Sequence, residues 1–412
     1  MASTRAPDIR EWLTGRIGAG VRLGLSTCAE MLERIGHPER AFPSIHVAGT
    51  NGKGSLCAHL SSMGSRNGHL IGLFTSPHLV TVEERARIDG RPVEPDQFDR
   101  YLEEVRQASL IEPAIHPTYF EATFLASLLA FAHAGVDRAV IETGLGGRLD
   151  ATRLVEADLC AITTISRDHT ELLGDDLGQI AAEKAGIHRE GVPLLCLHHD
   201  DASVRDAIEG AAGADVDWCH TVCDDAQGVA RELASTIAER LGWFEQETDV
   251  KWAGRTKDSF DWYAEVDCRI SAAHNEESLS HDLRAMDDQR YVLLLGMTQR
   301  HDLPSTMSAF EGASNCVRAV VTEVHGGRKP TASPQEITRE LVGLGHSEVE
   351  VSPDPLTAMD KAVGHAVELD CVVYVTGSVY LVGELLGELV RREGLDLWDT
   401  LTIHPPGTRT EG

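Results

Sequence analysis

The chain has little lysine: only 6 of its 37 basic residues are lysines, set against 65 aspartates and glutamates. Its formal net charge is −28 at pH 7 over 412 residues. Such a charge repels phosphate backbones and anionic headgroups, which argues against nucleic acid and against a membrane as partners. The combination of few lysines and many acidic residues fits either a GC-rich genome or a salty cytosol. An anionic ligand therefore needs positive charge that is built locally.

Long apolar runs and a signal-peptide pattern are also missing. No run is long enough to span a bilayer, and the N-terminal residues lack the pattern of a secretory signal. The nine cysteines are odd in number and scattered, which fits reduced thiols better than a disulfide framework. Cys219 and Cys223 flank His220, but no second ligand pair follows at zinc-site spacing, so we interpret them as structural. We expect a cytoplasmic, monomeric protein.

A glycine-rich stretch, HVAGTNGKGS over residues 46–55, follows the first predicted strand. Glycines let the backbone curl so that N–H groups point at an anion, and the following helix adds its positive N-terminus. Lys53 can reach outer phosphates, and a Ser or Thr hydroxyl can ligate magnesium. The alternative is a glycine-rich turn before an ordinary helix, and the spacing is tighter than in the common phosphate-loop motif. The predicted nucleotide-binding residues here are Gly49, Thr50, Asn51, Gly52, Lys53, Gly54 and Ser55.

The length favours two domains, since one core rarely serves a chain of this size. In the first half, apolar strands alternate with helical periodicity, which is typical of parallel βαβ units. Besides helices within 9–40, we predict strands at 44–47, 70–74, 138–142 and 159–165, and helices at 55–67 and 121–134. Ligands of such sheets gather beyond the carboxyl ends of the strands.

The second half carries another α/β pattern, after an acidic, helical stretch over 201–250 that is poor in clear strands. Its predicted strands lie at 268–272, 291–295, 317–321, 348–351 and 372–375. We therefore predict an α/β protein. A P-loop-type ATPase domain with a mainly parallel sheet would cover 1–250, a linker 251–258, and a smaller C-terminal Rossmann-like α/β domain 259–412.

Four further motifs follow the glycine loop: TSPHL at 75–79, ETGLGGRLDAT at 142–152, DHTELLG at 168–174 and EKAGI at 183–187. In this order they resemble the dihydrofolate synthase/folylpolyglutamate synthase family of the Mur ligase superfamily. The resemblance is close from about residue 22 to 195. It resumes at 273–275, 296–302 and 376–383.

The resemblance implies an ATP-dependent carboxylate–amine ligase. ATP phosphorylates the carboxylate to an acyl phosphate, and the amine of an amino acid, glutamate in the folate enzymes, attacks it. An amide, ADP and phosphate result. Positioning and charge neutralisation are the main requirements of such phosphoryl transfer.

The resemblance also implies roles for individual residues. The catalytic residues would be Lys53, Lys184 and His274. The Mg²⁺ ligands would be Ser76, Glu142 and His169. Beyond the loop, nucleotide contacts are implied for Arg255, Ser271 and Asn275, and Arg328 also matches a family arginine. Lys184 matches a lysine that is carbamylated in relatives, where it supports a second Mg²⁺.

Taken singly, these residues have ordinary explanations. Glu142 would be a strand-end surface carboxylate, His169 a loop histidine, Ser76 a turn residue and Lys184 a solvated helix lysine. The Lys53 loop, Glu142 and His169 lie just past predicted strand ends, and the order of all these residues around the phosphate loop favours the functional interpretation.

The second half departs from the family pattern. SAAHNE at 271–276 stands where relatives carry DGAHNP, so Ser271 replaces an aspartate associated with the nucleotide ribose. His301 replaces a lysine, with Arg300 adjacent, and QGVA at 227–230 lacks an asparagine that helps to hold adenine. The segment before Arg255 also looks short, so a small sheet of the relatives is expected to be missing. We predict weaker or less selective nucleotide binding, with Asp267 or Glu276 as a compensating acid.

Glutamate addition to a pterin or folate carboxylate is the default function. One alternative is a paralogue that joins a non-folate carboxylate to an amino acid or amine in specialised metabolism. Another is a non-catalytic homologue that binds nucleotide. The altered second half favours the paralogue, and the retained metal-site residue types count against the non-catalytic homologue.

Overall fold

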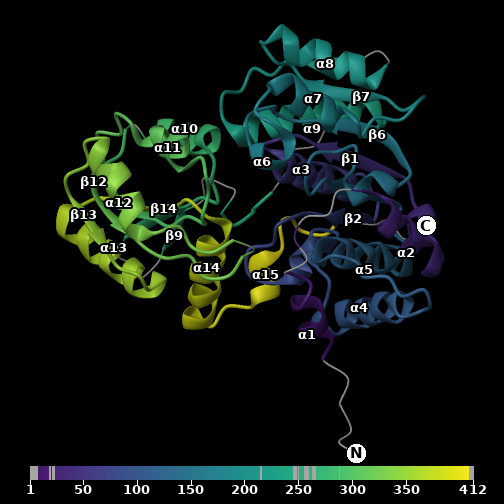
Figure 1. Cartoon of the computed structure of the whole chain (residues 1–412), viewed down its shortest axis with the longest axis horizontal. Coiled ribbons are helices and arrows are strands. Elements are labelled where there is room, and N and C mark those ends of the chain that lie inside the picture. Colours follow the sequence, from purple (N-terminus) through teal and green to yellow (C-terminus); the bar gives the residue numbers. More distant parts are fainter. Residues whose placement is uncertain are drawn as a thin grey trace, which may run out of the picture. The chain divides into compact units, whose positions relative to one another are not determined.

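The computed structural model describes residues 8–17, 20, 24–213, 216–244, 248, 250–254, 259–261, 266–286, 288–327 and 329–407 (Figure 1). Arg255 and Arg328, both predicted from the family pattern, lie outside these residues, as do 255–258 of the predicted linker. By their internal contacts the residues form two compact units. Unit 1 comprises 1–77, 82–250 and 402–412, and unit 2 comprises 78–81 and 251–401.

Unit 1 is built on an eight-stranded sheet in the order β4-β3-β2-β5-β1-β6-β7-β8. Its strands are β1 (Ser44–Ala48), β2 (Ile71–Phe74), β3 (Ala86–Ile88), β4 (Arg91–Pro92), β5 (Arg138–Glu142), β6 (Ala157–Ile162), β7 (Leu194–Leu197) and β8 (Val216–Cys219). Along the sheet, β2, β5, β1, β6, β7 and β8 pair with one another in parallel. Strands β3 and β4 pair antiparallel and form one edge. The mainly parallel α/β sheet is confirmed. Strands β3, β4, β7 and β8 are additions to the strands predicted from the sequence.

Helices surround this sheet (Figure 1). They are α1 (Ile9–Thr14), α2 (Ser26–Arg34), α3 (Lys53–Arg66), α4 (Pro95–Ser109), α5 (Tyr119–Ala134), α6 (Thr170–Leu173), α7 (Leu177–Ala185), α8 (Ala202–Ala212) and α9 (Ala226–Arg240). Helix α5 begins at a capping box, in which the Thr118 hydroxyl accepts from the Glu121 N–H and the Glu121 carboxylate accepts from the Thr118 N–H. Its residues from Glu121 to Phe131 are all buried, as its largely apolar sequence predicts.

Unit 2 is built on a six-stranded sheet in the order β13-β12-β11-β14-β10-β9. Its strands are β9 (Ser259–Asp261), β10 (Asp267–Ile270), β11 (Tyr291–Leu295), β12 (Cys316–Val321), β13 (Val349–Val351) and β14 (Val372–Thr376). Its helices are α10 (Glu276–Arg284), α11 (Leu303–Met307), α12 (Pro334–Gly343), α13 (Pro355–Leu369), α14 (Val379–Glu393) and α15 (Leu397–Leu401). Among the described strands of this sheet, β9 alone pairs antiparallel.

Strand β11 shows why both faces of this sheet are covered. All five of its residues are buried, and successive side chains point to opposite faces. Val292 and Leu294 pack with α13 and α14, whereas Leu293 and Leu295 pack with α10 and α12. The five strands predicted in this half are present, and β9 is an addition.

Two short segments pack with a different unit from the one to which the predicted domain boundaries assign them. Residues 78–81 join unit 2, where Leu79 is buried and packs so closely that a Cβ on Gly383 would lie 1.9 Å from its carbonyl oxygen. Residues 402–407 pack with unit 1, where the His404 ring lies 2.8 Å from the Ser61 hydroxyl. A single cut in the sequence therefore does not separate the two units.

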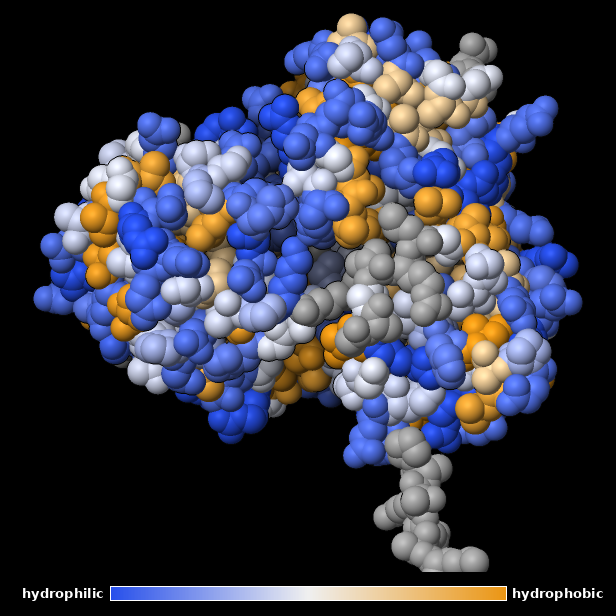
Figure 2. Space-filling view, viewed as in Figure 1, coloured by the Kyte–Doolittle hydropathy of each residue, from blue (hydrophilic) through white to orange (hydrophobic). Residues whose placement is uncertain are grey.

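Hydrophilic side chains cover much of the face in Figure 2, with apolar residues scattered between them. Within the described part of the chain, no helix has both the length and the apolar character needed to cross a membrane.

Candidate functional site

The glycine loop joins β1 to α3 in unit 1, as the sequence predicts. Every residue of β1 is buried, Gly49 has φ of 142°, and α3 begins at Lys53. A Cβ on Gly49 would lie 1.9 Å from Oγ1 of Thr163, so only glycine fits. The first bond of α3 runs from the Leu56 N–H to the Gly52 carbonyl at 2.9 Å. The N–H groups of residues 53–55 therefore lie at the open N-terminus of the helix.

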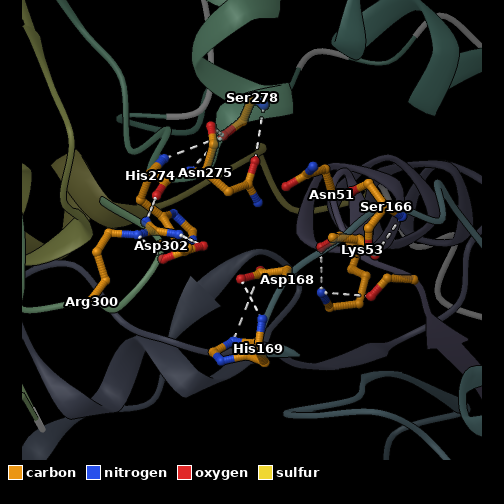
Figure 3. A network of polar contacts seen from close by, with 12 residues as sticks. Asn51, Lys53, Ser166, Asp168, His169, His274, Asn275, Ser278, Arg300 and Asp302 are labelled. Carbon is orange, nitrogen blue, oxygen red and sulfur yellow. Dashed lines mark hydrogen bonds and ion pairs between the residues drawn. The ribbon is translucent and has the colours of Figure 1, made fainter. Parts of the chain in front are cut away.

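The segment after β6 holds this loop in place. The Thr50 N–H donates to the Thr164 carbonyl at 2.7 Å, and the Asn51 N–H donates to the Thr164 hydroxyl at 3.1 Å. The Thr50 hydroxyl exchanges two 3.1 Å bonds with the backbone of Ser166 (Figure 3). The same segment continues to His169, so it ties the phosphate loop to one predicted metal ligand.

Two lysines converge on the carbonyl of Gly49. Lys53 Nζ donates to it at 3.1 Å and to the Thr50 carbonyl at 2.9 Å, while Lys184 Nζ donates to the Gly49 carbonyl at 2.6 Å. Lys184 is 5% exposed, so it is not the solvated lysine of the alternative interpretation. Burial, reinforced by the Lys53 ammonium, lowers the pKa of Lys184 to about 7 against the opposing pull of nearby carboxylates. An amine with such a pKa is partly neutral at neutral pH.

The loop after β5 positions the helix that carries Lys184. A Cβ on Gly147 would lie 2.7 Å from the Lys184 carbonyl, and the Arg148 N–H donates to the Glu183 carbonyl at 2.9 Å. The buried Asp150 holds this loop, because its carboxylate accepts from the N–H groups of Gly144 and Leu145 and of a third residue just beyond it. None of the motif roles predicted from the sequence includes Asp150. Its signal was an aspartate at the end of a glycine-rich turn, a common cap position.

The predicted metal ligands are partly brought together. Glu142 ends β5, is 4% exposed, and accepts a 2.9 Å hydrogen bond from the N–H of Ser76. His169 starts α6 with φ of 51°, is about half exposed, and pairs with Asp168 at 3.9 Å (Figure 3). Among the described residues, no three His, Cys, Asp or Glu side chains form a group that could hold a metal ion. The Ser76 backbone and the Glu142 carboxylate are therefore in contact, and the metal site itself stays a prediction.

Helix α9 also reaches the phosphate loop. It begins after Asp225, whose carboxylate caps it by accepting from the Gly228 N–H at 3.1 Å. Gln227 therefore lies in the first turn of α9, and its side-chain amide donates to the Ser55 hydroxyl at 3.1 Å. Ala230, where an asparagine was expected, is 4% exposed and packs in the interior.

In unit 2, the predicted residues lie beyond β10. Nδ1 of His274 lies 2.9 Å from the Ala272 carbonyl, and Asn275 caps α10 by accepting from the Ser278 N–H at 3.0 Å. Arg300 forms a two-point pair with Asp302 at 2.6 and 2.8 Å and donates to the His274 carbonyl (Figure 3). The hydrogen bonds from Arg300 lower the pKa of the Asp302 carboxyl. Arg300 thus orders the loop that carries His274.

The acid beside Ser271 is Asp282, not Asp267 or Glu276. The Ser271 hydroxyl donates to the Asp282 carboxylate, which also accepts from the Tyr374 hydroxyl at 3.1 Å. Glu276 instead accepts from the Ser280 hydroxyl at 3.2 Å. Asp282 is eleven residues from Ser271 in sequence but close to it in space, because α10 packs on the sheet and brings its second turn to the end of β10.

Comparison with known proteins supports the family resemblance. Residues 47–241 match the Mur ligase middle domain. The chain is 39% identical over 196 residues to the dihydrofolate synthase/folylpolyglutamate synthase of Bacillus subtilis, covering 47% of this chain and 46% of that protein. It is 28% identical over 415 residues to a probable bifunctional folylpolyglutamate synthase/dihydropteroate synthase of Haloferax volcanii, covering 88% of this chain and 48% of that protein. These matches span about half the length of the relatives.

Two solved structures share the fold over nearly their whole length. Escherichia coli FolC in complex with DHPP and ADP has a TM-score of 0.80 and 25% identity, covering 94% of this chain and 99% of that one. Mycobacterium tuberculosis folylpolyglutamate synthase complexed with ADP has a TM-score of 0.81 and 24% identity, covering 93% and 99%. The predicted combination of two α/β parts is thus a known architecture.

Proposed function

We propose that this chain, which belongs to the dihydrofolate synthase/folylpolyglutamate synthase family and contains a Mur ligase middle domain, is an ATP-dependent carboxylate–amine ligase that releases ADP. The observation that carries the proposal is the meeting of Lys53 and Lys184 at the Gly49 carbonyl, beside the open N-terminus of α3. The Lys53 ammonium and the N–H groups at the helix N-terminus provide what a polyphosphate requires, while Lys184 adds a buried amine at the same point.

The reaction would proceed in two steps. The carboxylate oxygen attacks the γ-phosphorus of ATP, the bond to the β,γ-bridging oxygen breaks, and ADP leaves. The amine then attacks the acyl phosphate, phosphate leaves with the C–O bond electrons, and the amine loses a proton. Lys53 and the N–H groups of residues 53–55 would neutralise charge that develops on the transferred group.

The metal would be held by Glu142, Ser76 and His169. A buried carboxylate beside a serine suits Mg²⁺, which prefers oxygen ligands and which would neutralise phosphate charge when bound. Lys184 would carry a carbamate, formed when its neutral amine adds to CO₂ and loses a proton. Its pKa of about 7 supplies the neutral amine that this addition needs.

The proposed substrates are glutamate and a pterin or folate carboxylate, the substrates that the relatives' names indicate. We propose that the protein acts in the cytoplasm as a monomer, without nucleic acid or membrane partners. The pairing of Ser271 with Asp282 favours a second candidate, a paralogue that acts on a non-folate carboxylate, because it is one of the points at which the second half departs from the family pattern.

The deciding experiment measures ADP release with ATP, Mg²⁺ and paired acceptors. Turnover only with dihydropteroate or folate plus glutamate supports the folate assignment. Turnover only with other acids or amines, identified by mass spectrometry of the amide, supports the paralogue. Nucleotide binding without any turnover would contradict both and leave a non-catalytic homologue.

A further inference from the structure

We propose that Gln227 is a positioning residue for the phosphate loop, and that its side-chain amide orients the Ser55 hydroxyl to donate its proton to a phosphate of the nucleotide. The inference rests on the proposed function, because a nucleotide must occupy the loop. It deepens that function by giving a residue of α9 a role at the phosphates. The family pattern associates the stretch 227–230 with adenine, whereas Gln227 contacts the first turn of α3.

The roles of donor and acceptor at Ser55 follow from the atoms. Nε2 of Gln227 carries two N–H donors and no acceptor, so Oγ of Ser55 accepts its 3.1 Å hydrogen bond. The Ser55 hydroxyl has one proton of its own, and within the part of the chain that the structure describes it donates that proton to no acceptor. The Gln227 N–H repels this proton, which therefore points elsewhere. Ser55 is thus held as a donor, and a phosphate oxygen is a strong acceptor.

The start of α9 fixes the place of Gln227. Helix α9 packs along α3 (Figure 1). Asp225 caps the first turn of α9, and a Cβ on Gly228 would lie 2.6 Å from Cβ of Cys223, so the chain enters the helix by a tight turn. The Glu232 carboxylate accepts from the Cys223 N–H at 3.2 Å, which ties this turn to the body of the helix. Gln227 therefore reaches Ser55 from a well-fixed backbone.

His59 is a second residue of α3 beside Gln227. It lies one turn after Ser55 on the same face of the helix and is 6% exposed. Its Nδ1 lies 2.8 Å from the Thr248 hydroxyl. Burial lowers the pKa of His59 to about 4, against the opposing pull of the Gln227 side chain. His59 is therefore neutral at physiological pH, and Gln227 faces two uncharged side chains of α3.

The alternative is that Gln227 only fastens α9 to α3. Gln227→Met keeps the length of the side chain and removes the amide, while Ser55→Ala removes the hydroxyl. The double variant Ser55→Ala/Gln227→Met shows whether the two side chains act as a unit. Gln97→Met is the matched control, because Gln97 is exposed in the first turn of α4. A fastening role predicts a lower melting temperature with unchanged nucleotide affinity.

The test measures dissociation constants for ADP and inosine diphosphate by calorimetry in the presence of Mg²⁺. These two nucleotides share their phosphates and differ in the base. We expect Gln227→Met to weaken both by the same factor, roughly tenfold, and Ser55→Ala to weaken both at least as much. The double variant should bind no more weakly than Ser55→Ala alone, and Gln97→Met should match wild type.

Three results would overturn the inference: unchanged constants in Gln227→Met, additive losses in the double variant, or a loss confined to ADP, which would place Gln227 at the base. A wild type that binds neither nucleotide would overturn it as well. Coupled losses in a protein without ligase turnover would contradict only the proposed function. Turnover together with additive losses would contradict only the role of Gln227.

Discussion

Lys53 and Lys184 donate hydrogen bonds to the same oxygen, the carbonyl of Gly49, at 3.1 and 2.6 Å. Burial, together with repulsion from the Lys53 ammonium at the same carbonyl, lowers the pKa of Lys184 to about 7. The site thus combines a lysine charged for phosphate with a lysine that can be neutral.

This relationship predicts a pH-dependent stability. Lys184 holds its proton up to about pH 10.5 in the unfolded chain but loses it near pH 7 when folded. Between these values the unfolded state binds more protons, so the free energy of unfolding rises with pH. Lys184→Met should be more stable than wild type at pH 7, by a few kcal/mol, and lose this advantage towards pH 10.

Urea unfolding at pH 7, 8, 9 and 10 in CO₂-free buffer measures the difference without carbamylation. Lys251→Met, which removes an exposed lysine, is the control and should show no such trend. A difference between wild type and Lys184→Met that stays constant over this range would contradict the lowered pKa.

Lys53→Ala should nearly abolish ligase activity and leave the fold intact. The lost charge-assisted contact to phosphate is expected to cost about 2–4 kcal/mol of transition-state stabilisation, or roughly 30- to 1,000-fold in kcat/KM. Steady-state ADP release checks this, with circular dichroism confirming the fold. Near-normal turnover would remove Lys53 from the mechanism.

Gly49→Ala should be far more harmful than Gly52→Ala. Both glycines have positive φ, but a Cβ at Gly49 meets Thr163 at 1.9 Å whereas one at Gly52 meets nothing within 4 Å. Strain plus overpacking at Gly49 should destabilise unit 1 by about 2–5 kcal/mol, against about 1 kcal/mol at Gly52. Thermal unfolding of both variants tests the difference. Equal melting temperatures would mean that the loop rearranges freely.

Glu142→Gln should raise the Mg²⁺ concentration needed for half-maximal activity about tenfold, because the buried Glu142 carboxylate would be the negatively charged ligand of the metal. Electron paramagnetic resonance with Mn²⁺ measures binding without turnover. His169→Ala should weaken binding as well, while Glu156→Gln, at an exposed carboxylate, should not. Wild-type Mn²⁺ affinity in His169→Ala would exclude His169 as a ligand.

The sequence alone predicts those elements whose signal lies within one short stretch of the chain. The apolar runs at 138–142 and 291–295 coincide with β5 and β11, and the glycine loop is where its composition predicts. Strand β8 was not predicted because it is a four-residue edge strand in which only Cys219 is buried, so its sequence resembles the surrounding polar chain. Asp282 escaped for a different reason: its link to Ser271 exists only once α10 packs on the sheet, and no motif spacing encodes that contact.

The acidic composition predicts a salt response that separates its two explanations. A net charge of −28 destabilises the compact state by self-repulsion, and salt screens it over a Debye length of about 10 Å at 0.1 M and about 3 Å at 1 M. The melting temperature should therefore rise by several degrees between 0.02 and 0.3 M KCl. Simple screening is nearly complete by about 1 M, so a composition set by the genome alone predicts a plateau there. A surface adapted to a salty cytosol predicts a continued rise to 3 M. Sorbitol at matched osmolality is the control for solvent exclusion. A melting temperature that stays constant or falls from 0.02 to 0.3 M KCl would show that surface repulsion does not limit the stability of this fold.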